Sequence, residues 1–155
     1  IDEWPADVLD AVRQSLLHAL SNSADHGYIL PSRRGERLSP AVLRVEADTD
    51  SSGMIHVRVR DFGAGLNLEK LKSMAQEKGF VPGPEETVAD VVFLDGATTA
   101  ETASATSGRG VGLSAVRELC RRFKGDAHLL ANDQGQGSLL TMTFEVANEH
   151  LKNSA

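Results

Sequence analysis

The segment Ser107–Leu113 reads Ser-Gly-Arg-Gly-Val-Gly-Leu, and it constrains this chain more than any other stretch. Glycines at every second position leave backbone N–H groups uncovered by side chains. Residues 114–124, which follow, have a helical pattern, so the positive end of a helix would point at whatever these N–H groups bind. This combination predicts a site that holds phosphate groups.

Two common phosphate-binding motifs do not fit the glycine segment. A dinucleotide-binding fingerprint needs its third glycine where Leu113 stands, and it comes early in a chain, directly after a strand. A P-loop needs Gly-Lys-Ser or Gly-Lys-Thr, which the chain lacks. Within the segment, Arg109 has two open interpretations: a charge-assisted donor to phosphate, or a plain surface residue.

Length and composition favour one intracellular domain. The 155 residues fit a single domain, 1–155, which we expect to be a piece of a longer protein because it starts at Ile1. The net charge of −6 argues against a nucleic-acid partner, and no apolar run is long enough for membrane insertion. The single cysteine, Cys120, cannot form an internal disulfide, so we expect a cytoplasmic protein with Cys120 as a small core residue.

Hydrophobic spacing predicts a long helix from about Pro5 to Asp25, ended by Gly27. Its expected buried stripe is Val8, Val12, Leu16, Ala19 and Leu20. Further along we expect strands at 41–47 and 55–59 around a turn at 50–53, a short helix that contains Leu68, Leu71 and Ala75 and stops near Gly79, and a second short helix around 88–93. We then expect a helix at 111–123 capped by Gly125, and strands at 127–131 and 139–146 around a turn at 132–137.

The order of these elements predicts an α+β sandwich, with helices packed on one face of a mixed β-sheet. Residues 95–109 do not fit any element, because Ala, Thr, Ser and Gly dominate them without apolar periodicity. A stretch of that length inside a compact domain is usually a functional flap or a disordered segment.

A polar ridge is expected along the first helix. His18, Asn22 and His26 are spaced four residues apart, so they lie one above another beside the apolar stripe. The alternative is an ordinary solvated face, which is the better interpretation for His18 taken alone. The Asn22 amide oxygen suits Mg²⁺, which keeps several waters and binds nucleotide phosphates. We expect Asp25 to support the metal through water, and His18 and His26 to donate hydrogen bonds to the transferred phosphate.

Asp61–Gly65 reads Asp-Phe-Gly-Ala-Gly at the end of a predicted strand. A carboxylate there can accept a hydrogen bond from an exocyclic amine such as that of adenine, and Gly63 and Gly65 let the backbone approach the base. The alternative is a simple turn after a strand. Asp-Phe-Gly also occurs in eukaryotic-type protein kinases, but the upstream glycine loop, the strand lysine and the His-Arg-Asp segment are missing from this chain.

In this order, the segments resemble the GHKL family of ATPases and kinases, the Bergerat fold of gyrase, Hsp90, histidine kinases and MutL. Within that family they are most similar to the ATP-binding domain of the CheA-type chemotaxis kinases. The segments that carry the resemblance are Leu16–Gly27 (N box), Pro31–Gly35 (connecting loop), Asp61–Gly65 (G1 box), Phe93–Thr99 (a reduced F box), Ser107–Leu113 (G2 box) and Gly135–Ser138 (the last glycine-containing turn).

The resemblance implies Mg-ATP binding, with Asn22 as the Mg²⁺ ligand, Asp61 as the adenine reader and an ATP lid at about 95–109. The nucleotide-binding residues that it implies are Asn22, Asp25, Asp61, Gly63, Gly65, Thr98, Thr99, Gly108, Arg109, Gly110, Val111 and Gly112. His18 stands where members that hydrolyse ATP with water carry a glutamate base. A histidine there is similar to the CheA-type kinases, so the catalytic roles fall to His18 and His26.

The function implied is a histidine protein kinase domain of two-component signalling in chemotaxis. Its γ-phosphoryl group would pass to a histidine on a separate phosphotransfer domain, with a response regulator downstream. Two alternatives remain open: a non-catalytic nucleotide-binding switch, and a protein serine kinase of the anti-sigma type.

Overall fold

The computed structural model describes residues 4–23, 42–97, 112–134 and 136–146. The strands are β1 (Leu43–Thr49), β2 (Met54–Asp61), β3 (Ala127–Ala131) and β4 (Ser138–Glu145), which form one sheet in the order β1-β2-β4-β3. The helices are α1 (Ala6–Asn22), α2 (Leu68–Lys78), the 3-10 helix η2 (Val88–Phe93) and α3 (Leu113–Arg122).

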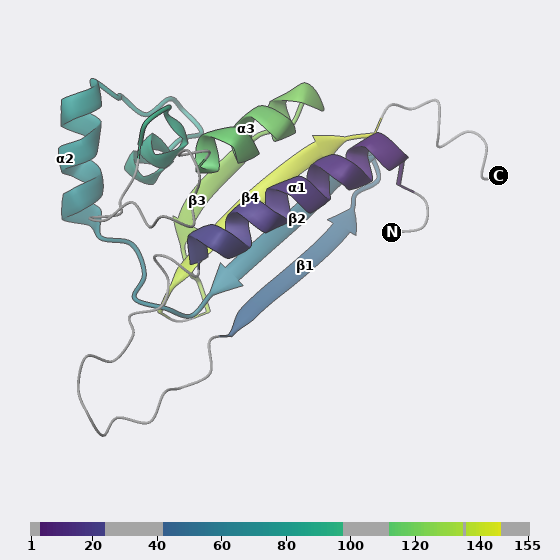
Figure 1. The fold of residues 1–155 in the computed structure, drawn as a ribbon, viewed down its shortest axis with the longest axis horizontal. Coiled ribbons are helices and arrows are strands. Elements are labelled where there is room, and N and C mark those ends of the chain that lie inside the picture. The colour runs from purple at the N-terminus through teal and green to yellow at the C-terminus, as the bar shows by residue number, and fades with distance from the viewer. Residues whose placement is uncertain (1–3, 24–41, 98–111, 135, 147–155) are drawn as a thin grey trace.

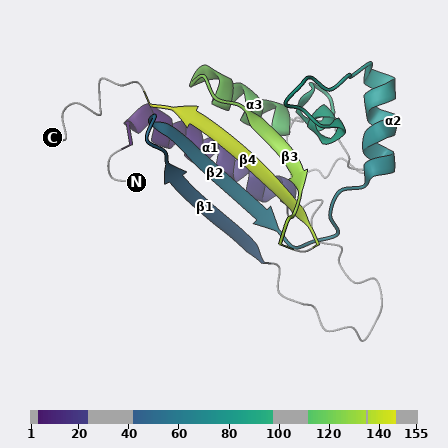
Figure 2. The same cartoon turned by 180° about the vertical axis from the view of Figure 1, so that it is seen from behind.

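Helices α1 and α3 lie side by side and cover one face of the sheet, as Figure 1 shows, and Figure 2 shows the opposite face without a helix over it. Helix α2 and η2 pack on each other at one end of this sandwich (Figure 1). The α+β class, with helices on one face, is therefore confirmed. The expected mixed sheet is not seen: each pairing among the described strands is antiparallel.

Alternation of side chains explains how the sheet meets the helices. On β2 the apolar residues Ile55, Val57 and Val59 are buried, while every second residue between them points to the opposite face. Val57 pairs with Met142 of β4, so the buried rows of neighbouring strands coincide. Strand β1 pairs with β2 in the predicted hairpin, but it lies at the edge and is largely exposed.

The buried face of α1 differs from the predicted one. Ala11 and Ser15 belong to it, together with Val8, Val12 and Ala19, whereas Leu20 keeps 38% of its surface exposed. Small side chains at three of these five positions let α1 pack closely on both α3 and β2. A leucine at the right helical spacing, such as Leu20, can therefore lie at the edge of the buried face and stay partly exposed.

Local side-chain bonds set the bounds of α2 and η2. The Asn67 side chain accepts a hydrogen bond from the Lys70 N–H at the start of α2, and Gly79 ends α2 in the left-handed conformation, as predicted. Thr87 and Asp90 form a capping box at η2. Asp90 is fully buried and also accepts the Leu129 N–H, which attaches η2 to β3.

The end of α3 corrects one prediction. Gly125 is not the cap residue itself: Phe123 stands at the cap and Lys124 takes the left-handed conformation, with φ at 52°, while the Gly125 N–H donates to the Cys120 carbonyl at the helix end. The reason for glycine at 125 is space: a Cβ there would lie 1.8 Å from the Thr143 carbonyl oxygen of β4. Gly125 therefore permits close contact between the chain after α3 and the sheet.

Cys120 is a core residue, as expected. It lies on the buried face of α3, and burial raises the pKa of its thiol to about 12. The thiol therefore stays protonated at neutral pH and does not act as a nucleophile. Within the described ranges, no helix combines the length and apolar character that spanning a bilayer requires.

Candidate functional site

The predicted motifs lie on elements whose ends face the same side of the molecule. The C-terminal ends of α1 and β2 and the N-terminal end of α3 all lie toward the side that α2 occupies, and the two views agree (Figures 1 and 2). These ends carry Asn22, Asp61 and Gly112. Of these three ends, only the end of β2 at Asp61 has more than one described residue on each side of it along the chain.

Asp61 is the last residue of β2 and is only 4% exposed. Its Oδ1 accepts hydrogen bonds from the Gly63 N–H at 3.0 Å and from the Ser138 N–H at 3.2 Å. Its Oδ2 accepts the Ser138 hydroxyl. The carboxylate is thus held in one orientation by donors from two segments: Gly63, two residues after Asp61, and Ser138, 77 residues after it.

Three hydrogen bonds from the described residues reach the Asp61 carboxylate. An ionised carboxylate has about four lone-pair sites, and the three bonds from Gly63 and Ser138 occupy two on Oδ1 and one on Oδ2. Among the described residues, Oδ2 accepts only the bond from the Ser138 hydroxyl. The adenine-reading role of Asp61 stays a prediction.

The turn that joins β3 to β4 packs against the Asp61 strand end. The Asn132 amide donates to the Asp61 carbonyl at 2.9 Å, and the Gln136 amide donates to the Ala64 carbonyl at 3.2 Å. Gly137 has φ at 120°, and a Cβ on it would lie 2.1 Å from the Asp61 carbonyl oxygen. Only glycine fits where these two segments meet.

Sequence reasoning missed Ser138, Asn132 and Gln136 as members of this site. The only signals for them were the predicted turn at 132–137 and the resemblance of Gly135–Ser138 to a glycine-containing turn, which mark a turn and not its contacts. Gly63 and Gly65 are where they were predicted. The Gly63 N–H bonds to Asp61, and Gly65, with φ at 82°, faces the Gly137 backbone.

The predicted metal and phosphate ligands on α1 are described only in part. His18 and Asn22 are both half-buried, and Asn22 is the last residue of the helix. Asp25 and His26 lie outside the described residues. Within the described part of the chain, no group of three or more His, Cys, Asp and Glu side chains is arranged to hold a metal ion. A Mg²⁺ site would therefore depend on the Asn22 amide together with phosphate oxygens and water.

The predicted phosphate site lies at the N-terminus of α3, which the structure describes from Gly112 onward. Gly112 is its N-cap, offers no side-chain hydrogen bond to the first turn, and is exposed. That turn contains no acidic residue, so its positive end is not neutralised locally. The rest of the predicted phosphate-contacting set, Thr98, Thr99, Gly108, Arg109, Gly110 and Val111, lies outside the described residues.

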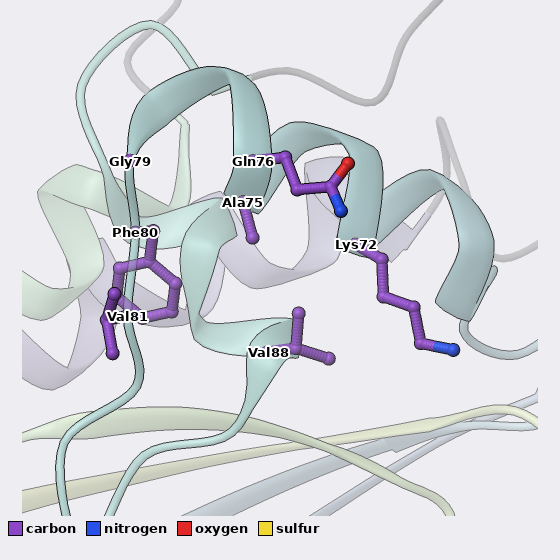
Figure 3. A pocket seen from close by; sticks show the side chains of 7 residues that line it. All are labelled: Lys72, Ala75, Gln76, Gly79, Phe80, Val81 and Val88. Carbon is purple, nitrogen blue, oxygen red and sulfur yellow. The ribbon is translucent and has the colours of Figure 1, made fainter.

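A separate cavity of about 410 Å³ lies between α2 and the start of η2 (Figure 3). Apolar side chains of Phe80, Val81 and Val88 form much of it, and Lys72 and Gln76 lie along its rim. None of the predicted site residues lines it. The cavity is therefore distinct from the Asp61 strand end.

Comparison with known families agrees with this geometry. Residues 7–148 match the family model described as histidine kinase-, DNA gyrase B-, and HSP90-like ATPase. The chain belongs to this family. The predicted GHKL membership is thereby confirmed.

Several chemotaxis proteins are among the relatives of this GHKL domain. It is 34% identical over 147 residues to the chemotaxis protein CheA of Bacillus subtilis, covering 90% of this chain and 22% of CheA. It is 32% identical to CheA of Halobacterium salinarum, with 93% and 22% covered, and 32% identical to the gliding motility regulatory protein of Myxococcus xanthus, with 87% and 18% covered. The chain thus spans about a fifth of the length of these relatives.

Solved histidine kinases share the fold of this GHKL domain. The mycobacterial sensor histidine kinase MprB superposes with a TM-score of 0.54 at 14% identity, covering 87% of this chain and 70% of the MprB chain. A histidine kinase domain from the blue-light activated kinase of Erythrobacter litoralis EL346 gives a TM-score of 0.52 at 13% identity, covering 95% and 48%. At these identities the likeness concerns the fold alone.

Proposed function

We propose that this GHKL domain is the catalytic ATP-binding domain of a CheA-like histidine protein kinase. It binds Mg-ATP and transfers the γ-phosphoryl group to a histidine on a separate phosphotransfer domain, from which a response regulator is phosphorylated, in the cytoplasm. The observation that carries the proposal is the buried Asp61 carboxylate at the end of β2, which Gly63 and Ser138 hold in one orientation. The similarity to CheA supports the choice of acceptor.

Asp61 positions the adenine end of the nucleotide. Its Oδ2, which also accepts the Ser138 hydroxyl, accepts a hydrogen bond from the exocyclic amino group, and the glycines Gly63 and Gly65 let the base approach the strand end closely. Guanine carries a carbonyl at the corresponding position, and this carbonyl cannot donate a hydrogen bond to a carboxylate. The site therefore selects adenine nucleotides over guanine nucleotides.

The phosphate end lies toward the N-terminus of α3 and the C-terminus of α1. Backbone N–H groups at Gly112, and at 108–111 before it, donate to phosphate oxygens. Asn22 supplies an amide oxygen to Mg²⁺, which neutralises charge on the phosphates when bound. His18 and His26 donate hydrogen bonds to the γ-phosphoryl oxygens.

Phosphoryl transfer to histidine makes few chemical demands on this domain. An imidazole nitrogen of the acceptor attacks the γ-phosphorus, the bond to the β,γ-bridging oxygen breaks, and ADP leaves with that oxygen. A neutral imidazole is already a nucleophile, so no residue has to activate a water. The presence of His18 in place of a glutamate base agrees with this requirement. The domain contributes to the reaction by positioning the γ-phosphoryl group for the acceptor and by neutralising charge on the phosphates.

The direct test is incubation of the 155-residue chain with γ-labelled ATP and a histidine phosphotransfer domain of a CheA protein. We expect label on the acceptor that is stable in alkali and lost in acid, as phosphohistidine requires. Label on serine, stable in acid, would instead identify the anti-sigma type of kinase. Nucleotide binding without transfer to any acceptor would identify a non-catalytic switch, and either result would contradict the proposal.

Replacement of Asp61 by asparagine tests the base-reading role. We expect Asp61→Asn to weaken adenine nucleotides by about 1–3 kcal/mol, the cost of disturbing a buried charged hydrogen bond. Titration calorimetry with ADP and GDP measures the change. Asp133→Asn is a matched control, because it removes one negative charge from the neighbouring turn, where Asp133 pairs with Arg60 instead. Equal binding of ADP and GDP by the parent chain would rule out the role.

A further inference from the structure

Arg117 on α3 is an unusual buried cation. It is 5% exposed, although arginine is almost never fully buried without partners. Its Nε lies 2.6 Å from Asp126 Oδ1, at the start of β3, and its Nη2 lies 2.7 Å from Glu86 Oε1, before η2. One guanidinium thus bridges carboxylates from two different parts of the chain.

An aromatic ring completes the surroundings of Arg117. The guanidinium carbon lies 5.1 Å from the centre of the Phe93 ring, within the range of a cation–π contact. Phe93 is the last residue of η2 and is itself buried. Arg117 therefore holds α3 against both the chain before η2 and the end of η2.

These contacts lie close to the point where two predicted nucleotide segments meet. A Cβ built on Gly112 would lie 4.0 Å from the Ala97 carbonyl oxygen, so the chain after η2 and the chain before α3 come together there. Arg117 is on the second turn of α3, four residues after Leu113, the first residue of the helix. The ion pairs thus connect the N-terminal half of α3 with the η2 region.

The charges of this network are complementary at neutral pH. The backbone hydrogen bond from Gly83, followed by the contact with Arg117, lowers the pKa of Glu86. Burial acts to raise the pKa of Asp126, but the hydrogen bonds from Arg117 and the Ala127 N–H, together with the charges of Arg117 and Arg121, outweigh it and the pKa is lowered. Both carboxylates are therefore ionised opposite a guanidinium that stays protonated.

We infer that Arg117 is a positioning residue for the nucleotide phosphates: by bridging Glu86 and Asp126 and stacking near Phe93, it fixes the N-terminus of α3 relative to η2. This inference rests on the proposed function, because it assigns the phosphate end of the nucleotide to that helix terminus. The adenine end, at Asp61, is held by Ser138 and Asn132, and among the described residues no hydrogen bond or ion pair joins these two to Arg117, Glu86 or Asp126. Loss of the bridge should therefore affect phosphate recognition and spare base recognition.

The test compares affinities for adenosine and ADP in the 155-residue chain. Arg117→Lys keeps the charge but cannot span two carboxylates with a planar fork. We expect the ratio of ADP to adenosine affinity to fall by about tenfold, the worth of one charged hydrogen bond, while adenosine affinity stays unchanged. In single-turnover phosphotransfer, the rate should fall by tenfold to about a hundredfold.

Arg121→Lys is the matched control. Arg121 lies on the same helix and reaches the same carboxylate, with Nη2 3.4 Å from Asp126 Oδ2, but it is largely exposed and does not contact Glu86. We expect its ADP to adenosine ratio to equal that of the parent. Replacement of an arginine that pairs with Asp126 but not with Glu86 is therefore predicted to have no effect on phosphate recognition.

Glu86→Gln decides the question if Arg117→Lys fails to fold. It removes the negative charge that Arg117 contacts before η2, while its amide oxygen can still accept the Gly83 N–H that Glu86 accepts, and its expected effect is a fall of roughly threefold in the same ratio. Two results overturn this inference and leave the proposed function standing. One is an unchanged ratio of ADP to adenosine affinity in folded Arg117→Lys and Glu86→Gln, and the other is an equal loss of adenosine and ADP affinity. Failure of the parent chain to bind ADP better than adenosine overturns the proposed function instead.

Discussion

Gly137→Ala is expected to abolish measurable nucleotide binding and to lower the free energy of unfolding by roughly 2–5 kcal/mol. Its Cβ would lie 2.1 Å from the Asp61 carbonyl oxygen and 2.9 Å from Asp61 Oδ1. The atoms it would meet are mainly backbone, so the strand end and the turn have to separate. Separation would remove both Ser138 hydrogen bonds from the carboxylate. Urea denaturation and titration calorimetry with Mg-ADP measure the two effects.

Gly79→Ala provides the matched control for that strain. Gly79 also has positive φ, at 63°, but no atom lies within 4 Å of a Cβ built on it. We therefore expect a loss of only about 1 kcal/mol in unfolding free energy, from backbone strain alone, with unchanged nucleotide affinity. If Gly137→Ala is no more harmful than Gly79→Ala, the turn does not hold Asp61 in place.

Asn22→Ala is expected to remove the dependence of ATP affinity on Mg²⁺ while the fold stays intact. Alanine is a better helix former than asparagine, and Asn22 is only half-buried at the end of α1. We expect affinity in the presence of Mg²⁺ to fall by tenfold to about a hundredfold, toward the value in its absence. Calorimetric titration of ATP with Mg²⁺ and with a chelator measures the difference.

Ser21→Ala tests whether the loss of Mg²⁺-dependent ATP affinity is specific to replacement of Asn22. Ser21 precedes Asn22 on α1 and is exposed, so its replacement changes the same helix turn without removing the predicted ligand. We expect both ATP affinities of this variant to match those of the parent. Unchanged Mg-ATP affinity in Asn22→Ala would refute the assignment of Asn22 as the metal ligand.

Much of the fold could be predicted because local periodicity specifies it. The alternation at Ile55, Val57 and Val59 predicts a half-buried strand, and the register with β1 places it in the expected hairpin. Gly79 ends α2 as predicted, because the left-handed conformation after a helix favours glycine. The order of elements then allows few arrangements in which the helices cover one face of the sheet.

Predictions failed where a residue serves a contact that is distant along the chain. Gly125 was expected to cap a helix, yet it is required by the Thr143 carbonyl of another strand. Arg117 stands among polar neighbours on an amphipathic helix, and nothing in that pattern indicates its burial between Glu86 and Asp126. Neither role has a signature in the spacing of nearby residues.

The family, the α+β class and the position of Asp61 at a strand end were determined by the sequence alone. They depend on residue types and short spacings, which act through hydrogen bonds and burial within a few residues. Which donors reach the Asp61 carboxylate, and which cation connects α3 with η2, was decided only by tertiary structure. Those contacts join residues such as Asp61 and Ser138, 77 positions apart, and packing of the whole sandwich is what brings them within hydrogen-bond distance.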